Sequence, residues 1–89
     1  MTITEPSIVL VRVDLLKQIQ ARLEGQLDDP GLAAWAFEHF YAEETGQIDY
    51  EPGSEPVIAE VLDTLMFSDD PSFRLNEDEL RELAVRLGV

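Results

Sequence analysis

Proline and glycine divide this chain of 89 residues into four segments, each with apolar residues at spacings of three and four. Such spacing places the apolar side chains on one face of an α-helix. We expect the first helix over residues 7–24, the second between 29 and 46, the third from 54, and the last over 76–88. None of these short helices is stable alone, so they must pack together. The sequence therefore predicts an all-α fold, a small antiparallel four-helix bundle, as one helical domain over residues 1–89.

Capping residues mark where these helices are expected to begin and end. Asp29 before Pro30 is predicted to cap the second helix, because aspartate accepts hydrogen bonds from free N–H groups and proline fits the first turn. Gly46 is predicted to end that helix, and residues 76–79 have the pattern of a capping box for the last one. The start of the first helix stays open, because residues 8–13 are rich in β-branched side chains and could form a short strand.

The apolar stripes predict the hydrophobic core, while residues 47–55 are rich in Asp, Pro and Gly and predict an exposed loop. Trp35 and Phe37 are two apart on the second helix, so they cannot both face inward equally. The one left exposed beside the acids is a candidate interface anchor. The predicted core faces contain Ile8, Val11, Leu15, Ile19 and Leu23; Leu32, Ala33, Ala36, Phe37, Phe40 and Tyr41; Val57, Ile58, Val61, Leu62, Leu65 and Met66; and Leu80, Leu83, Ala84 and Leu87.

The charge of the chain is concentrated in its middle. No Lys or Arg occurs between Arg22 and Arg74, and these 51 residues hold 13 carboxylates. The other six acids balance all six bases, so the formal charge of −13 belongs to residues 23–73. This density predicts a partner with a basic surface, although charge that merely keeps a small domain soluble explains it equally well. It disfavours nucleic acid and membrane surfaces as ligands, because both are anionic.

No motif in the sequence predicts a catalytic, metal or cofactor site. The chain has no Cys, and its one histidine, His39, has only Glu43 as a partner on the same helix face, too few ligands for zinc. In the acidic loop, Gly53 and Ser54 stand where a calcium-binding EF-hand needs an oxygen ligand and a glycine. Acyl carrier proteins are similar in size and charge, but residues 53–55 lack their Asp-Ser-Leu motif. We predict that the protein is not an enzyme, with no cofactor.

The sequence also bears on location. The apolar run at residues 8–11 ends at Arg12, too early for a signal peptide. No stretch approaches the roughly 20 apolar residues of a membrane span. The absence of cysteine leaves the redox compartment undetermined, and a cytoplasmic location is the simplest expectation.

A series of weak features runs along nearly the whole chain. The first helix ends at Leu23-Glu24-Gly25, the second contains Trp35-Ala36, an acidic segment leads to an apolar helix over residues 56–65, and acids open the last helix at residues 77–79. In this pattern the chain resembles the family of the colicin D immunity protein and its small bacterial relatives. The resemblance implies an acidic four-helix bundle that binds a tRNA-cleaving toxin domain. It further implies that carboxylates cover the basic active cleft where substrate phosphates would sit.

Charge and resemblance together predict a toxin inhibitor that binds a basic protein. Such binding is possible because a nuclease cleft is lined with Lys and Arg. The alternative is a non-inhibitory adaptor or orphan interaction domain, and an adjacent toxin gene would distinguish the two. The acids at the end of the second helix also lie where the helix dipole disfavours negative charge. The predicted acidic patch, with a tyrosine as its anchor, consists of Glu43, Glu44, Asp49, Tyr50, Glu51 and Glu55.

Overall fold

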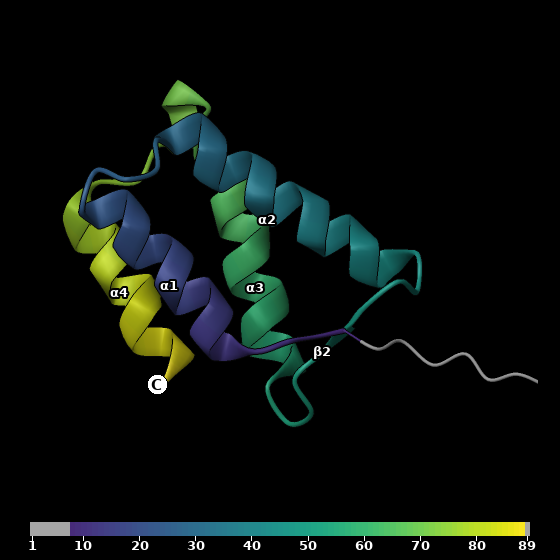
Figure 1. Ribbon diagram of the computed structural model, residues 1–89. Helices are drawn as coiled ribbons and strands as arrows, with labels where there is room; N and C mark the ends of the chain where they lie inside the picture. Colours follow the sequence, from purple (N-terminus) through teal and green to yellow (C-terminus); the bar gives the residue numbers. More distant parts are fainter. Residues whose placement is uncertain (1–7, 89) are drawn as a thin grey trace, which may run out of the picture.

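The computed structural model describes residues 8–88, which form a small helical bundle. Consecutive helices run in opposite directions (Figure 1), so the predicted all-α antiparallel arrangement is confirmed. In chain order the elements are β1 (Val9–Leu10), α1 (Arg12–Leu23), α2 (Asp29–Glu44), β2 (Asp49–Tyr50), α3 (Glu55–Met66), the 3-10 turn η1 (Pro71–Phe73) and α4 (Glu77–Leu87).

The helices pack mainly as two pairs, α2 with α3 and α1 with α4. Helix α2 crosses α3 at an incline, and its C-terminal half reaches beyond the other helices (Figure 1). This projection leaves one side of α2 without a neighbouring helix in the described part of the chain.

One hydrophobic cluster joins all four helices, and α3 lies at its centre with five buried side chains. The predicted core faces of α3 and α4 are confirmed, and Glu60 and Asp63 are exposed on the opposite side of α3. Each large apolar side chain that is fully buried contributes roughly 1.5–3 kcal/mol relative to exposure. The large apolar side chains that are fully buried are Leu15, Ile19, Leu32, Ile58, Val61, Leu62, Leu65, Leu80 and Leu87.

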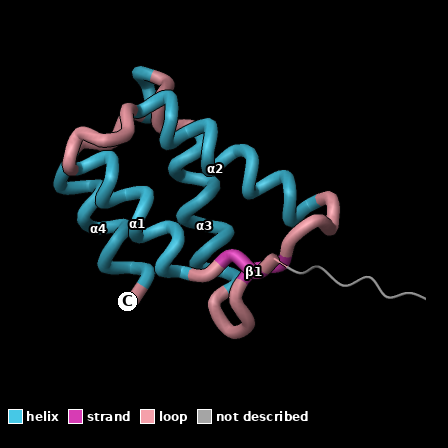
Figure 2. The backbone as a smooth tube through the Cα atoms, viewed as in Figure 1, coloured by secondary structure: helices cyan, strands magenta, loops and turns pink. Residues whose placement is uncertain are grey.

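Residues 9–10 form a strand rather than a helix, so the helix predicted over residues 7–24 begins only at Arg12; residue 7 lies outside the described residues. Strand β1 pairs in parallel with β2 (Figure 2). In this pairing Leu10 lies opposite Tyr50. The β-branched side chains favour extended backbone here. Asp14 then starts the helix, because its carboxylate accepts a hydrogen bond from the Val11 N–H at 3.2 Å.

The expectation of an exposed loop over residues 47–55 is wrong in part. Ile48 and Tyr50 are buried, and Asp49 between them is exposed. Side chains alternate between the two faces of a strand, so positions two apart can both enter the core. Pairing with β1, a long way off in sequence, fixes this alternation.

The helix caps follow the sequence closely, with one shift. Asp28, not Asp29, caps α2, and its carboxylate accepts from the Gly31 N–H at 2.8 Å. Proline therefore takes the second helical position rather than the first. Gly46 follows the helix with a φ of +79°, as predicted. The capping box at residues 76–79 is also confirmed, with hydrogen bonds of 2.8 and 2.9 Å.

Candidate functional site: an acidic surface with an exposed aromatic pair

The predicted acidic patch forms only in part. Glu44 is exposed on the last turn of α2 and Asp49 is exposed on β2, while Glu43 is half-buried. Glu55 is exposed at the start of α3, and its carboxylate accepts from the Gly53 N–H at 3.0 Å. These four carboxylates lie at the end of the bundle where α2, β2 and α3 follow one another. Their role in partner binding stays a prediction.

Tyr50 is not exposed, so the expectation that it anchors a partner at the surface is wrong. Only 7% of the residue is accessible, and its hydroxyl finds no hydrogen-bond partner among residues 8–88. Burial, reinforced by the negative charges of Glu43 and Glu44, raises the pKa of Tyr50 to about 12. Strand alternation is the physical reason, because it turns this ring inward and its acidic neighbours outward.

Glu51 is occupied by an interaction within the chain. Its carboxylate accepts from the backbone N–H of Arg12 at 3.0 Å and from the Arg12 Nε at 3.1 Å. These hydrogen bonds lower the pKa of Glu51. Arg12 also donates from Nη1 to the Leu87 carbonyl oxygen at 3.2 Å. The pair therefore ties β2 to the start of α1 and the end of α4, and it removes Glu51 from the free acids.

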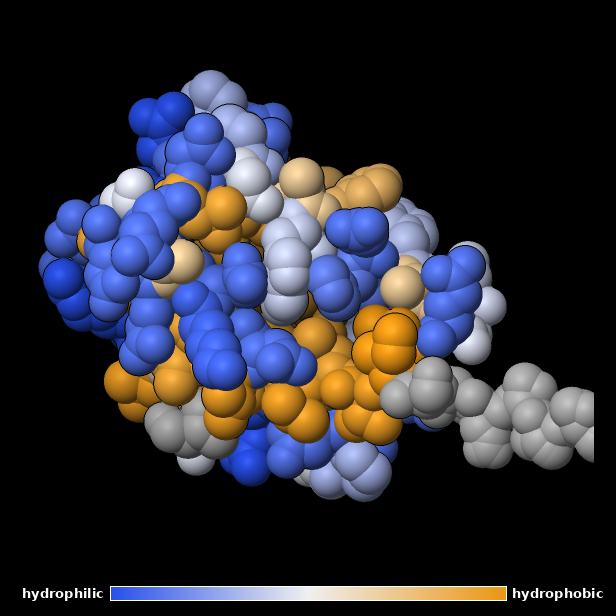
Figure 3. All heavy atoms as spheres, in the orientation of Figure 1, coloured by the Kyte–Doolittle hydropathy of each residue, from blue (hydrophilic) through white to orange (hydrophobic). Residues whose placement is uncertain are grey.

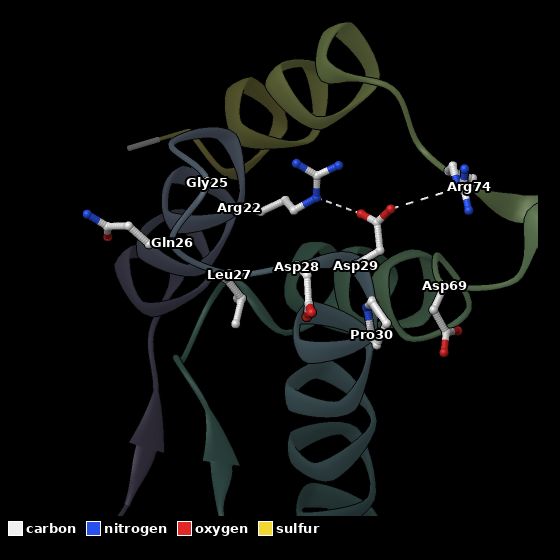
Figure 4. A pocket seen from close by; sticks show the side chains of 9 residues that line it. All are labelled: Arg22, Gly25, Gln26, Leu27, Asp28, Asp29, Pro30, Asp69 and Arg74. Atoms are coloured by element: carbon white, nitrogen blue, oxygen red, sulfur yellow. Dashed lines mark hydrogen bonds and ion pairs between the residues drawn. The ribbon is translucent and has the colours of Figure 1, made fainter.

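The opposite end of the bundle carries a second ionic cluster, which lines an open hollow of about 620 Å³. Figure 4 shows Arg22 and Arg74 on either side of the Asp29 carboxylate. The Arg22 Nε donates to Asp29 at 2.6 Å, and this hydrogen bond raises the pKa of Arg22. Arg74 lies at 3.8 Å from the same carboxylate. The cluster joins the end of α1 to the start of α2, a structural role that leaves little charge unbalanced.

Phe37 and Tyr41 form an exposed aromatic pair on α2, although the sequence predicts both in the core. They are 54% and 46% accessible, and their ring centroids lie 4.7 Å apart. The prediction is wrong because α2 turns the face with Leu32, Ala33 and Ala36 toward the bundle, and its C-terminal half reaches beyond the other helices (Figure 1). Of the two aromatic candidates for an anchor, Phe37 is thus the exposed one. Trp35 is half-buried against the core and stacks on His39, with ring centroids 4.3 Å apart.

Most of the carboxylates in residues 23–73 form no ion pair in the part of the chain that the structure describes. Three of the 13 pair with an arginine: Asp29 with Arg22 and Arg74, Glu51 with Arg12, and Glu60 with Arg86. The remaining ten of the 13 have no ion-pair partner within residues 8–88. They are Glu24, Asp28, Glu38, Glu43, Glu44, Asp49, Glu55, Asp63, Asp69 and Asp70.

Other classes of site find no support in the part of the chain that the structure describes. No group of three or more His, Asp or Glu side chains there is placed to hold a metal ion. None of the described helices combines the length and apolar character needed to cross a membrane. The chain matches no protein family, no curated protein and no solved structure.

Proposed function

We propose that the chain is an acidic module that binds a protein with a basic surface. The observation that carries this proposal is the set of ten carboxylates in residues 23–73 without an ion-pair partner among residues 8–88. Two unit charges at 4 Å interact by about 1 kcal/mol in water and more near a protein surface, so several such contacts together support binding. A field of one sign also raises association rates by roughly 10- to 1,000-fold at low salt.

The proposed activity is inhibition of a nuclease toxin of the tRNA-cleaving type by coverage of its active cleft. Lys and Arg in such a cleft bind substrate phosphates, and carboxylates on a folded protein compete for the same positions. The proposed contacts are Glu43, Glu44, Asp49 and Glu55, which lie at one end of the bundle. The resemblance to the immunity family supports the inhibitory role, for which a cytoplasmic location is the simplest proposal.

The test begins with the purified chain as bait in extracts of its source cells at low salt. Proteins eluted by salt are identified, and each basic one is assayed for cleavage of tRNA with and without an equimolar amount of the chain. We expect one captured protein to cleave tRNA and the chain to suppress that cleavage. Capture of a basic protein whose activity is unchanged would favour the adaptor. Capture of no basic protein would overturn the proposal.

A further inference from the structure

Helix α2 is apolar on two sides, and within residues 8–88 only one of them is covered. Leu32, Ala33 and Ala36 are buried against the bundle. A second set of apolar residues, at spacings of four, three and four, is exposed to solvent. Residues at this spacing share one face of a helix, and a helix that is apolar all round is normally enclosed. We call this set the outer face of α2; it consists of Pro30, Ala34, Phe37 and Tyr41.

Phe37 stands as a ridge between two hollows on the surface. One, of about 310 Å³, lies between α2 and the end of α3 and is lined by Ala34 and Met66 as well as Phe37. The other, of about 530 Å³, extends from Tyr41 to Ile8 and Ile48. Apolar surface is also seen near β1, at the base of the bundle (Figure 3), where Ile8 is exposed. A ridge between hollows is the shape into which the side chains of a second helix interdigitate.

Charge indicates what covers this face. Glu38 and Glu44 are exposed beside the outer face of α2, and Asp69 lines the smaller hollow. No Lys or Arg occurs anywhere in residues 23–73 to balance them. A second copy of the chain would bring another formal charge of −13 to the contact, which repulsion disfavours. A basic partner gains from the same charges, since Arg side chains can pair with the carboxylates and stack on the aromatic rings.

We propose that the outer face of α2 is the docking surface for an amphipathic helix of a basic partner. Apolar side chains of that helix fill the two hollows around Phe37. Its Arg or Lys side chains pair with Glu38 and Glu44. The inference rests on the proposed function, because it names where the basic partner binds and which element of the partner is recognised. The exposed pair of Phe37 and Tyr41 gives the partner a defined position on the acidic surface, which the charges alone do not.

The test uses a synthetic helical peptide of roughly 18 residues, long enough to be helical on its own, with leucines at helical spacing and arginines elsewhere. A second peptide has the same composition but scrambled leucine positions. Binding is followed by two-dimensional NMR of the labelled protein at about 0.15 M salt, where exposed charges are partly screened. We expect the amphipathic peptide to bind at least about tenfold more tightly than the scrambled one, as expected for a buried anchor. The amide shifts should concentrate on α2.

Variants then assign the site. The double variant Phe37→Ser, Tyr41→Ser should weaken binding of the amphipathic peptide about tenfold or more, as loss of a central anchor does. Its control is Phe73→Ser, which removes another exposed aromatic side chain, 61% accessible, and should leave binding unchanged. The pair Glu38→Gln, Glu44→Gln should weaken binding more than Glu24→Gln, Asp63→Asn, which removes the same charge elsewhere.

The possible failures are distinguishable. Equal binding of the two peptides, or equal loss in the Phe37, Tyr41 and Phe73 variants, would overturn the docking surface while leaving a charge-driven partner possible. Shifts centred on the Arg22, Asp29 and Arg74 cluster would also overturn it, because they would place the peptide at the other end of the bundle. Lack of binding by either peptide, even at low salt, would count against both the docking surface and the proposed preference for basic partners.

Discussion

Removal of one buried oxygen atom should make this protein more stable. In Tyr50→Phe the ring keeps its place in the core, where only 7% of the residue is accessible, while the hydroxyl without a hydrogen-bond partner among residues 8–88 is lost. Burial of such a group costs roughly 1–3 kcal/mol in mutational data. We therefore expect the free energy of unfolding to rise by about 1 kcal/mol, the lower end of that range, which corresponds to an increase in Tm of about 4–8 °C for a domain of this size.

The assay is urea unfolding followed by circular dichroism, with a thermal melt as a second measurement. The matched control is Tyr41→Phe, which removes the same atom from an exposed ring and should change stability by less than about 0.5 kcal/mol. A loss of stability in Tyr50→Phe would refute the reasoning. It would mean that the hydroxyl makes a hydrogen bond, and the acceptors to test first are Glu43 and Glu44, whose negative charges raise the pKa of Tyr50.

Three further predictions concern pH and salt. The pKa of Tyr50 is raised from 10.0 to about 12, so folding favours the neutral form of this side chain over the ionised form. The stability that depends on the neutral form is fully present below pH 10 and is lost as pH rises towards 12. The alkaline loss of stability in pH-dependent melts should therefore be smaller in Tyr50→Phe. Arg12 lowers the pKa of Glu51, so the stability that the ionised carboxylate contributes is present above the ordinary pKa of 4.5 and is lost as pH falls through the folded value. Glu51→Gln should lower stability at pH 7 and flatten the fall of stability at acid pH. An unchanged fall at acid pH would contradict the ionic role of Glu51. Repulsion among the unpaired carboxylates should make added salt raise Tm at pH 7, and a fall in Tm would indicate that attractive pairs dominate.

The helices were predictable because their signals are local. The apolar spacing of α3 and α4 and the capping box at residues 76–79 each lie within a few residues, and each is confirmed. The strand pair was not predictable to the same degree. The β-branched side chains in residues 8–13 leave a short strand open, but only its pairing with a segment some 40 residues away decides for the strand and buries Tyr50.

The site depends more strongly on tertiary structure than the helices do. The acid-rich segment is obvious in the sequence, but the sequence does not show that Arg12 reaches Glu51 across 39 positions. The sequence places Phe37 in the core because its spacing from Ala33 and Phe40 fits an inward face. In the structure the inward face is the one with Leu32 and Ala36, and Phe37 is exposed. The exposed face did have a signal, the spacing of four, three and four from Pro30 to Tyr41. That spacing alone cannot tell which of two apolar faces packs inward.

The measurement that tests the central claim most directly is the association rate of the captured basic partner with charge variants of the chain, as a function of salt. One variant neutralises Glu43, Glu44 and Asp49 by amide substitution. Its control neutralises Glu77, Asp78 and Glu82 on α4, which removes the same formal charge from the balanced part of the chain. We expect the first variant to associate much more slowly and with a weaker salt dependence, and the control to associate nearly as fast as the original chain. Equal slowing of both variants would show that net charge alone matters, and an effect in neither would contradict the claim that these carboxylates bind a basic partner.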